Sequence, residues 1–161
     1  MPGGRFSSPV ERDLRAAGWH PGRAVDVTGW RQLLEAGDEL RMHRAAAEFL
    51  AEFGGLNVEI DGPGLTAARE PFELDPELCV GEEDRFAEWG ADLGCSLFPL
   101  GGSIGGVSAW GSPRWGEIFL VEAGVGSFGI GDAALENLVL GVMPSERFQE
   151  RCVRWRPPVG G

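Results

Sequence analysis

The sequence contains no lysine and no tyrosine, and all 14 of its basic residues are arginine. The absence of lysine excludes chemistry that needs a lysine amine, such as Schiff-base formation, pyridoxal phosphate attachment and phosphate binding in a Walker-type loop. Basic residues are outnumbered by 25 acidic ones, which gives a formal net charge of −11. This charge disfavours nucleic acid or an anionic membrane as the main partner, because both are negative, and is compatible with a basic protein partner.

Cysteine is also scarce, and Cys79, Cys95 and Cys152 are widely spaced. Because there is no Cys-x-x-Cys pair and no histidine near a cysteine, we expect free thiols rather than a metal site or a disulfide framework. No hydrophobic run approaches the ~18 residues of a membrane span, and the N-terminus lacks the basic and apolar segments of a signal peptide. We therefore expect a cytoplasmic protein that uses no cofactor.

The 161 residues correspond to one domain, which we place at residues 5–146, followed by a flexible Arg/Pro-rich tail at 147–161. Helix-spaced apolar residues, a capping box at Ser8–Glu11 and terminal glycines predict helices near residues 8–17, 28–36, 43–53, 82–93 and 135–142. Strands are predicted at 56–60, 72–76, 97–100 and 117–121, where Pro99 suggests an edge or a strand end. This order predicts an α+β fold, with N-terminal helices on a mostly antiparallel sheet and further helices after the central acidic segment and at the C-terminal end.

Two glycine motifs resemble catalytic or nucleotide-binding signatures. Residues 101–105 fit G-x-S-x-G around Ser103, but no helix pattern and no histidine follow, so we interpret them as a Gly-rich hairpin or loop. Residues 124–129 fit G-x-G-x-x-G, but only 32 residues remain after Gly129 (161 − 129), too few for the rest of a dinucleotide-binding sheet. We expect these glycines to form a tight turn from strand to helix. An enzyme or ligand binder that uses either motif remains an alternative.

The strongest charge feature is residues 70–92, where nine acidic residues accompany a single base, Arg85. They form either a solvated helix face or a docking surface for a cationic partner, where charge would speed association and select the partner. Trp110 and Trp115, in a Gly-rich segment, are expected to be exposed aromatic anchors. The predicted partner-binding residues are Glu73, Asp75, Glu77, Glu82, Glu83, Asp84, Glu88, Trp110 and Trp115. No catalytic, cofactor-binding or metal-binding residue is predicted.

Several motifs, in their order and spacing, resemble the SUKH superfamily of bacterial immunity proteins, and in particular its third group. They are Arg5–Ser7, Ala17–Arg23, Phe49–Leu56, Phe72–Pro76, Leu97–Gly101, Gly116–Leu120 and Ala134–Leu138. The resemblance runs from about Arg5 to Pro144, and the chain departs from the family pattern at residues 102–115.

The resemblance implies helices packed on a mostly antiparallel sheet, and no catalysis. It implies a cytosolic protein that neutralises a cognate toxin by binding it, the toxin often being a nuclease or a nucleic-acid deaminase with a basic substrate cleft. The alternative is a regulatory or scaffold protein without catalytic activity, as found in other branches. The family offers no fixed interface residues, so the predicted site depends on charge and on tryptophan placement.

Overall fold

The centre of the protein is a six-stranded antiparallel sheet in which each strand pairs with the next along the chain. A computed structural model describes residues 5–103, 108–121 and 125–145, and the statements below concern these residues. The strands are β1 (Asn57–Val58), β2 (Phe72–Glu73), β3 (Phe98–Ser103), β4 (Ala109–Ser112), β5 (Glu117–Val121) and β6 (Val125–Ile130). The proposed tail at 147–161 lies outside the described residues.

The helices begin and end close to the positions that the sequence predicts. They are α1 (Ser8–Ala17), α2 (Thr28–Glu35), α3 (Arg44–Phe53), the short 3-10 helix η1 (Pro76–Cys79), α4 (Glu83–Leu93) and α5 (Asp132–Leu140). Gly18, Gly94 and Gly141 end α1, α4 and α5 in the left-handed conformation that glycine adopts without strain. The order of helices and strands confirms the α+β fold.

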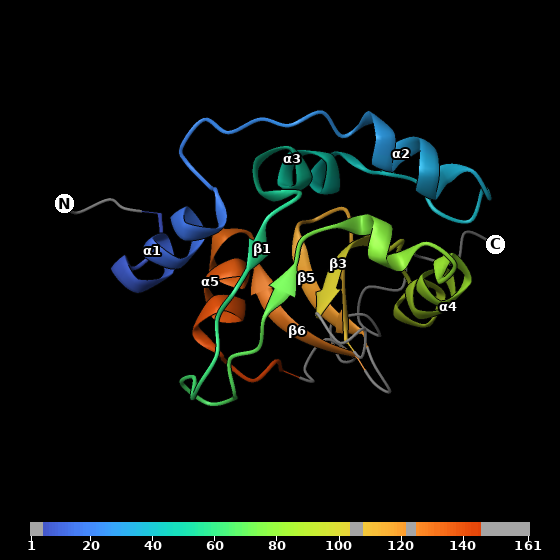
Figure 1. Cartoon of the computed structure of the whole chain (residues 1–161). Coiled ribbons are helices and arrows are strands. Elements are labelled where there is room, and N and C mark those ends of the chain that lie inside the picture. The colour runs from blue at the N-terminus through green and yellow to red at the C-terminus, as the bar shows by residue number, and fades with distance from the viewer. Residues whose placement is uncertain (1–4, 104–107, 122–124, 146–161) are drawn as a thin grey trace.

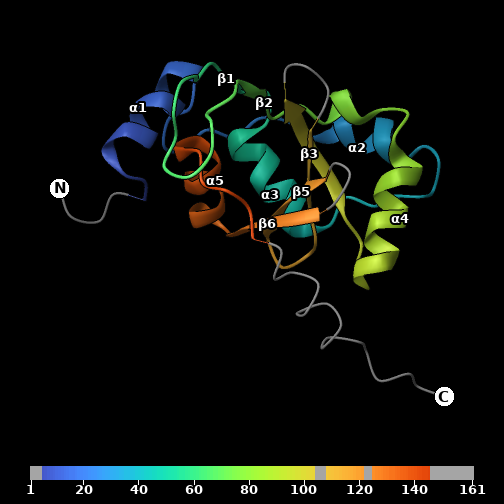
Figure 2. The ribbon, with the colours of Figure 1, turned by 90° about the horizontal axis from the view of Figure 1, so that it is seen from below.

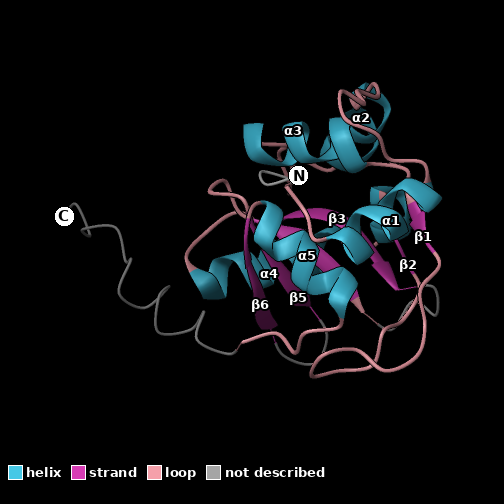
Figure 3. Ribbon diagram, turned by 90° about the vertical axis from the view of Figure 1, so that its left-hand side faces the viewer, coloured by secondary structure: helices cyan, strands magenta, loops and turns pink. Residues whose placement is uncertain are grey.

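The helices form layers around the sheet (Figure 1). Helices α1 and α5 lie on one side of the strands and α4 lies on the other, as the view from below also shows (Figure 2). Helices α2 and α3 lie together above the strands (Figure 3). Both faces of the sheet therefore have helical cover, and this separates the surface around α4 from the surface around α5.

Aromatic packing joins the helical layers. Phe6, Trp19 and Phe53 contact one another around the ends of α1 and α3, with ring centroids 5.6 to 6.2 Å apart. On the other face of the sheet, Phe86 of α4 lies so close to Gly111 of β4 that a Cβ there would be 2.9 Å from the ring. Glycine at this position thus allows α4 to approach the sheet.

The structure corrects two predictions and decides between the alternatives for a third. The capping box predicted at Ser8–Glu11 is wrong: Ser8 is the first residue of α1, the preceding Ser7 makes no side-chain cap hydrogen bond, and Glu11 pairs with Arg15. Of the two alternatives for Pro99, the strand end is correct and the edge is not, because the proline is the second residue of β3, which lies between β2 and β4. The described glycines of 124–129 do not form a strand-to-helix turn, because residues 125–130 are strand β6, paired with β5.

Candidate partner-binding surface

The seven predicted acidic residues all lie on the chain between β2 and α4. Glu73 is in β2, Asp75 and Glu77 are at η1, and the remaining four are at the start and middle of α4. The side chains of Glu77, Asp84 and Glu88 are exposed, and the other four residues are half-buried. These acidic residues share one local segment because they are close neighbours along the chain, and their part in binding stays a prediction.

Part of this acidity has a local structural role. A carboxylate oxygen of Asp75 accepts a hydrogen bond from the Glu77 amide at 3.0 Å, which caps η1. Glu83 accepts a hydrogen bond from the Gly81 amide at 2.8 Å, and Glu82 lies 3.4 Å from the guanidinium of Arg85. Glu77 and Glu88 have no such role among the described contacts, so charge substitutions there test binding with the least effect on folding.

Two apolar side chains interrupt the acidic segment. Leu78 and Val80 are 48% and 47% exposed, although burial of such side chains normally stabilises a fold. Leu78 also borders a pocket of about 130 Å³ between the η1–α4 segment and strands β3 to β5. An apolar centre with a charged rim is the usual anatomy of a protein-protein interface.

The cysteine beside this pocket is not activated for nucleophilic chemistry. Cys79 is 2% exposed, and its thiol donates to the carbonyl oxygen of Gly101 at 3.6 Å. Burial raises the pKa of the Cys79 thiol to about 12, so the thiolate is scarce at neutral pH. Cys79 is a free thiol, as predicted, and Cys152 lies outside the described residues.

Trp110 is not the exposed anchor that the sequence predicts. It is 6% exposed and packs edge-to-face against Phe72 and Phe128, with centroids 6.1 and 5.7 Å away. The prediction failed because the burial of Trp110 in β4 depends on rings from β2 and β6, which are distant in sequence. A buried tryptophan cannot anchor a partner by docking its ring on the surface.

Trp115 is half-buried in the turn between β4 and β5. Its indole N–H donates to a carboxylate oxygen of Glu117 at 2.6 Å, and the Ser127 hydroxyl donates to the other oxygen. Glu117 is itself only 3% exposed, so these bonds satisfy a buried carboxylate. Trp115 therefore has a structural role, and the residue as a whole is partly accessible.

The G-x-S-x-G serine closes a hairpin, as predicted. Ser103 ends β3, its amide donates to the Ser108 carbonyl at 2.9 Å, and its hydroxyl oxygen accepts from the Ser108 amide at 3.1 Å. The partners of the two histidines are backbone carbonyl oxygens and not the Ser103 hydroxyl: His20 contacts that of Pro21, and His43 contacts that of Ser112. Ile104 and Gly105 lie outside the described residues.

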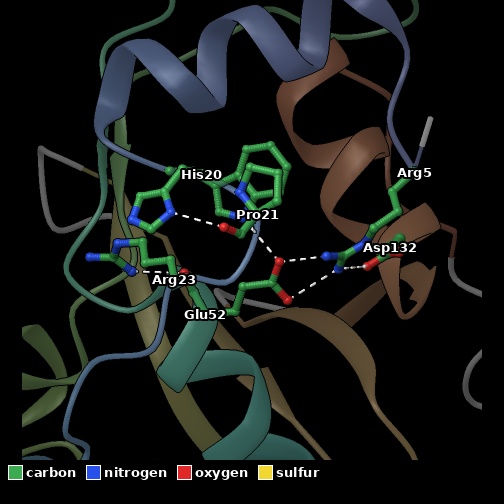
Figure 4. A network of polar contacts seen from close by, with 7 residues as sticks. Arg5, His20, Pro21, Arg23, Glu52 and Asp132 are labelled. Atoms are coloured by element: carbon green, nitrogen blue, oxygen red, sulfur yellow. Dashed lines mark hydrogen bonds and ion pairs between the residues drawn. The ribbon is translucent and has the colours of Figure 1, made fainter. Parts of the chain in front are cut away.

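Sequence reasoning missed a network that joins four parts of the chain (Figure 4). Arg5 binds Glu52 of α3 through Nη1 at 2.5 Å and Asp132 of α5 through Nη2 at 2.8 Å. The hydrogen bonds to Asp132 and Glu52 raise the pKa of Arg5 further above its already high usual value. Glu52 also accepts from the indole N–H of Trp19 at 3.0 Å. The partners lie far apart in sequence, so no local spacing could reveal them.

His43 is the second residue whose role depends on the fold. Its Nδ1 accepts from the Ala46 amide at 3.1 Å and so caps α3, while Nε2 lies 2.7 Å from the carbonyl oxygen of Ser112 on β4. These partners require a neutral ring with its proton on Nε2. Burial lowers the pKa of His43, and the Ser112 hydrogen bond offsets part of that effect. The sequence did predict a histidine at the helix start, but not its bond to the sheet.

The described residues contain no group of three or more histidine, cysteine or acidic side chains placed to hold a metal ion. Within the same part of the chain, the helices are too short or too polar to cross a membrane.

Comparison with known proteins identifies the family. Neither the curated proteins nor the solved structures give a match to this chain. A family model described as SUKH-3 immunity protein matches residues 6–141. This match covers the sheet and its helices from the start of α1 to the end of α5. The chain therefore belongs to the SUKH-3 immunity protein family.

Proposed function

We propose that this protein neutralises a cognate bacterial toxin in the cytoplasm by binding it and blocking its active site, without catalysis. The observation that carries the proposal is the family match over residues 6–141, since that family is one of immunity proteins. An immunity protein of this kind needs a complementary surface and affinity, not a reactive centre.

The charge of the chain supports a basic toxin as the partner. Its net charge of −11 attracts a cationic protein and repels nucleic acid. A nuclease or nucleic-acid deaminase carries positive charge where it binds phosphate, and carboxylates on a protein surface can occupy such a cleft in place of phosphates. We therefore propose a toxin of one of these two classes.

We place the contact on the acidic surface, defined as Glu73, Asp75, Glu77, Glu82, Glu83, Asp84 and Glu88 together with Leu78 and Val80. Its exposed carboxylates would steer the toxin to this face, while the two apolar side chains would lose water on contact and slow dissociation. Trp115 is retained as an accessory anchor because the residue is only half-buried. Trp110 is removed from the proposed contact because it is buried.

The test is the rate of association with the purified toxin domain encoded beside this gene. The variant Glu77→Lys/Glu88→Lys changes the net charge by +4 on the acidic surface, and Glu59→Lys/Asp61→Lys makes the same change at exposed residues near β1. At low salt we expect association to slow by about tenfold or more in the first variant and to change little in the second. Rising salt should slow the wild-type protein and reduce the difference.

Equal slowing in both variants would show that only the net charge matters and that the contact lies elsewhere. If the toxin does not bind the wild-type protein at all, the regulatory or scaffold alternative replaces the immunity role.

A further inference from the structure

The last described residue, Ser145, is fixed to the outer edge of the sheet. Its amide donates to the Ser127 carbonyl oxygen at 2.8 Å, and the Ser127 amide donates to the Ser145 carbonyl oxygen at 2.8 Å. Because this pairing is antiparallel, the chain that follows Ser145 leaves in the direction of Val125, the first residue of β6. The tail, residues 147–161, is therefore attached to the sheet at a known point.

A continuous row of paired residues connects this point to the acidic surface. Val125 of β6 pairs with Val121 of β5, which pairs with Ala109 of β4. Ala109 pairs with Gly102 of β3, and Gly102 pairs with Glu73 of β2, the first residue of the acidic surface. Neighbouring strands lie ~4.8 Å apart, so the distance from β6 to β2 along this row is about 19 Å.

The pocket beside Leu78 lies along the same row. Its lining includes Gly102, Ala109 and Val121 from the row, and Leu78 and Glu82 from the acidic surface. A segment that crosses from β6 to the acidic surface on this face of the sheet would pass over the pocket. It would also cover Leu78, which is 48% exposed.

The tail is complementary to the acidic surface in charge and in apolar content. It contains four arginines and one glutamate, so its net charge is +3, and the remaining residues carry −14 of the total of −11. Residues 151–156 read Arg-Cys-Val-Arg-Trp-Arg, in which arginines are interspersed with apolar side chains. The acidic surface has carboxylates around the exposed Leu78 and Val80, so both kinds of side chain meet a suitable partner.

We propose that residues 151–156 bind the acidic surface of their own chain and occupy it until the toxin displaces them. An extended chain spans ~3.4 Å per residue, so Arg151 can lie about 20 Å from Ser145 and Arg156 about 37 Å, which is enough for the crossing. Tethering gives the tail an effective concentration of about 1 mM, so weak contacts are sufficient.

This arrangement makes the acidic surface selective. A basic protein that is attracted only by charge has to compete with the tail, whereas a toxin with a complementary surface displaces it. The displacement by the toxin rests on the proposed function, but the contact between the tail and the acidic surface does not.

The test is a paramagnetic label at Pro158→Cys in the ¹⁵N-labelled full chain, with Cys95 and Cys152 replaced by serine. Cys79 stays unlabelled, because it is buried and burial raises the pKa of its thiol to about 12. At low salt we expect the label to broaden the amide NMR signals of residues 77–88 more than those of α1, which lies on the other side of the sheet (Figure 2).

Charge variants of the labelled chain show whether the arginines hold the tail. Arg151→Ser/Arg154→Ser should lower the ratio of bound to free tail by about threefold, and 1 M salt should act in the same direction. The matched control, Arg12→Ser/Arg41→Ser, removes two exposed arginines outside the tail and should leave the broadening at 77–88 unchanged.

Three results would overturn the proposed contact. They are equal broadening of α1 and of residues 77–88, broadening at 77–88 that persists in Arg151→Ser/Arg154→Ser, and equally strong broadening when the labelled chain is ¹⁴N and is mixed with unlabelled ¹⁵N chain. The last result would place the tail on a second copy.

The displacement is tested separately with the toxin domain. Arg151→Ser/Arg154→Ser should associate with it about threefold faster than Arg12→Ser/Arg41→Ser, since both variants have the same net charge and only the first frees the acidic surface. Equal rates would overturn the competition. If the wild-type chain does not bind the toxin, the proposed function fails, while the NMR result still decides whether the tail binds the acidic surface.

Discussion

Replacement of Glu52 by alanine should destabilise the protein more than any other single loss of a surface carboxylate on α3. Glu52 accepts hydrogen bonds from Arg5 and from the buried Trp19, so it connects the N-terminal segment and the end of α1 to α3. The alanine variant removes both bonds and leaves the Trp19 N–H without its acceptor. Arg5 keeps its second partner, Asp132.

The expected loss follows from the exposure of each group. The side chains of Arg5 and Glu52 are 44% and 23% exposed, so water and salt screen their ion pair, which contributes about 0.5 kcal/mol. Trp19 is 4% exposed, and loss of its bond to a charged acceptor costs about 2 kcal/mol. Glu52→Ala should thus lower the free energy of unfolding by about 2.5 kcal/mol. Glu52→Gln keeps an acceptor oxygen for Trp19 and should lose about 1 kcal/mol.

Urea unfolding followed by circular dichroism measures these differences. The matched control is Glu48→Ala on the same helix, where the ion pair with Arg44 is formed by side chains 67% and 90% exposed. This control should change the stability by less than about 0.5 kcal/mol. A Glu52→Ala variant as stable as Glu48→Ala would refute the role assigned to the network.

Two other predictions concern stability. His43 is neutral in the folded chain, with its pKa held below the usual 6.5 by burial, so the unfolded chain binds more protons below pH 6.5. The free energy of unfolding should therefore fall as the pH decreases below about 6.5. Urea unfolding at pH 7.5 and at pH 5.5 measures this difference, which should be smaller in His43→Asn, a variant that can still cap α3. Gly141→Ala should lower the free energy of unfolding by about 2 kcal/mol or more, because Gly141 has a φ of +74° and the added Cβ would lie 2.8 Å from the Ala67 carbonyl oxygen. An unchanged melting temperature would contradict this prediction.

Elements with a strong local pattern were predictable. Helix α3 has apolar residues at helical spacing and Gly54 after its last turn, and α4 has acidic residues in its first turn and Gly94 at its end. These signals depend on neighbouring residues, so they survive without knowledge of the fold. Strand β5 was predictable because its apolar run is nearly continuous, and such a run is typical of a strand inside a sheet, where β5 lies.

Strand β6 was not predictable in this way. Gly126 and Gly129 have low strand propensity and match a known turn motif, but here they lie in a strand paired with β5. A Cβ at Gly126 would be 2.9 Å from Pro144, so the glycine allows the chain after α5 to approach the sheet. That reason is a long-range contact, which the sequence does not display.

The candidate site also contains features set by sequence neighbours and features set by long-range contacts. The acidic residues of η1 and α4 lie on one segment because they are close in sequence, and their part in binding stays a prediction. The burial of Trp110 depends on Phe72 and Phe128, which come from other strands, and the role of Glu52 depends on Arg5 and Trp19. These contacts arise only when the sheet and the helices have assembled.

The proposal that this protein acts by binding and not by catalysis can be tested by titrating a fixed concentration of active toxin domain with the purified chain. Toxin activity should then fall linearly and reach zero near one chain per toxin. Intact, active toxin should then be recovered after the complex is separated. Full toxin activity at saturating protein, or complete inactivation by a small fraction of an equivalent with a covalent change in the toxin, would contradict it.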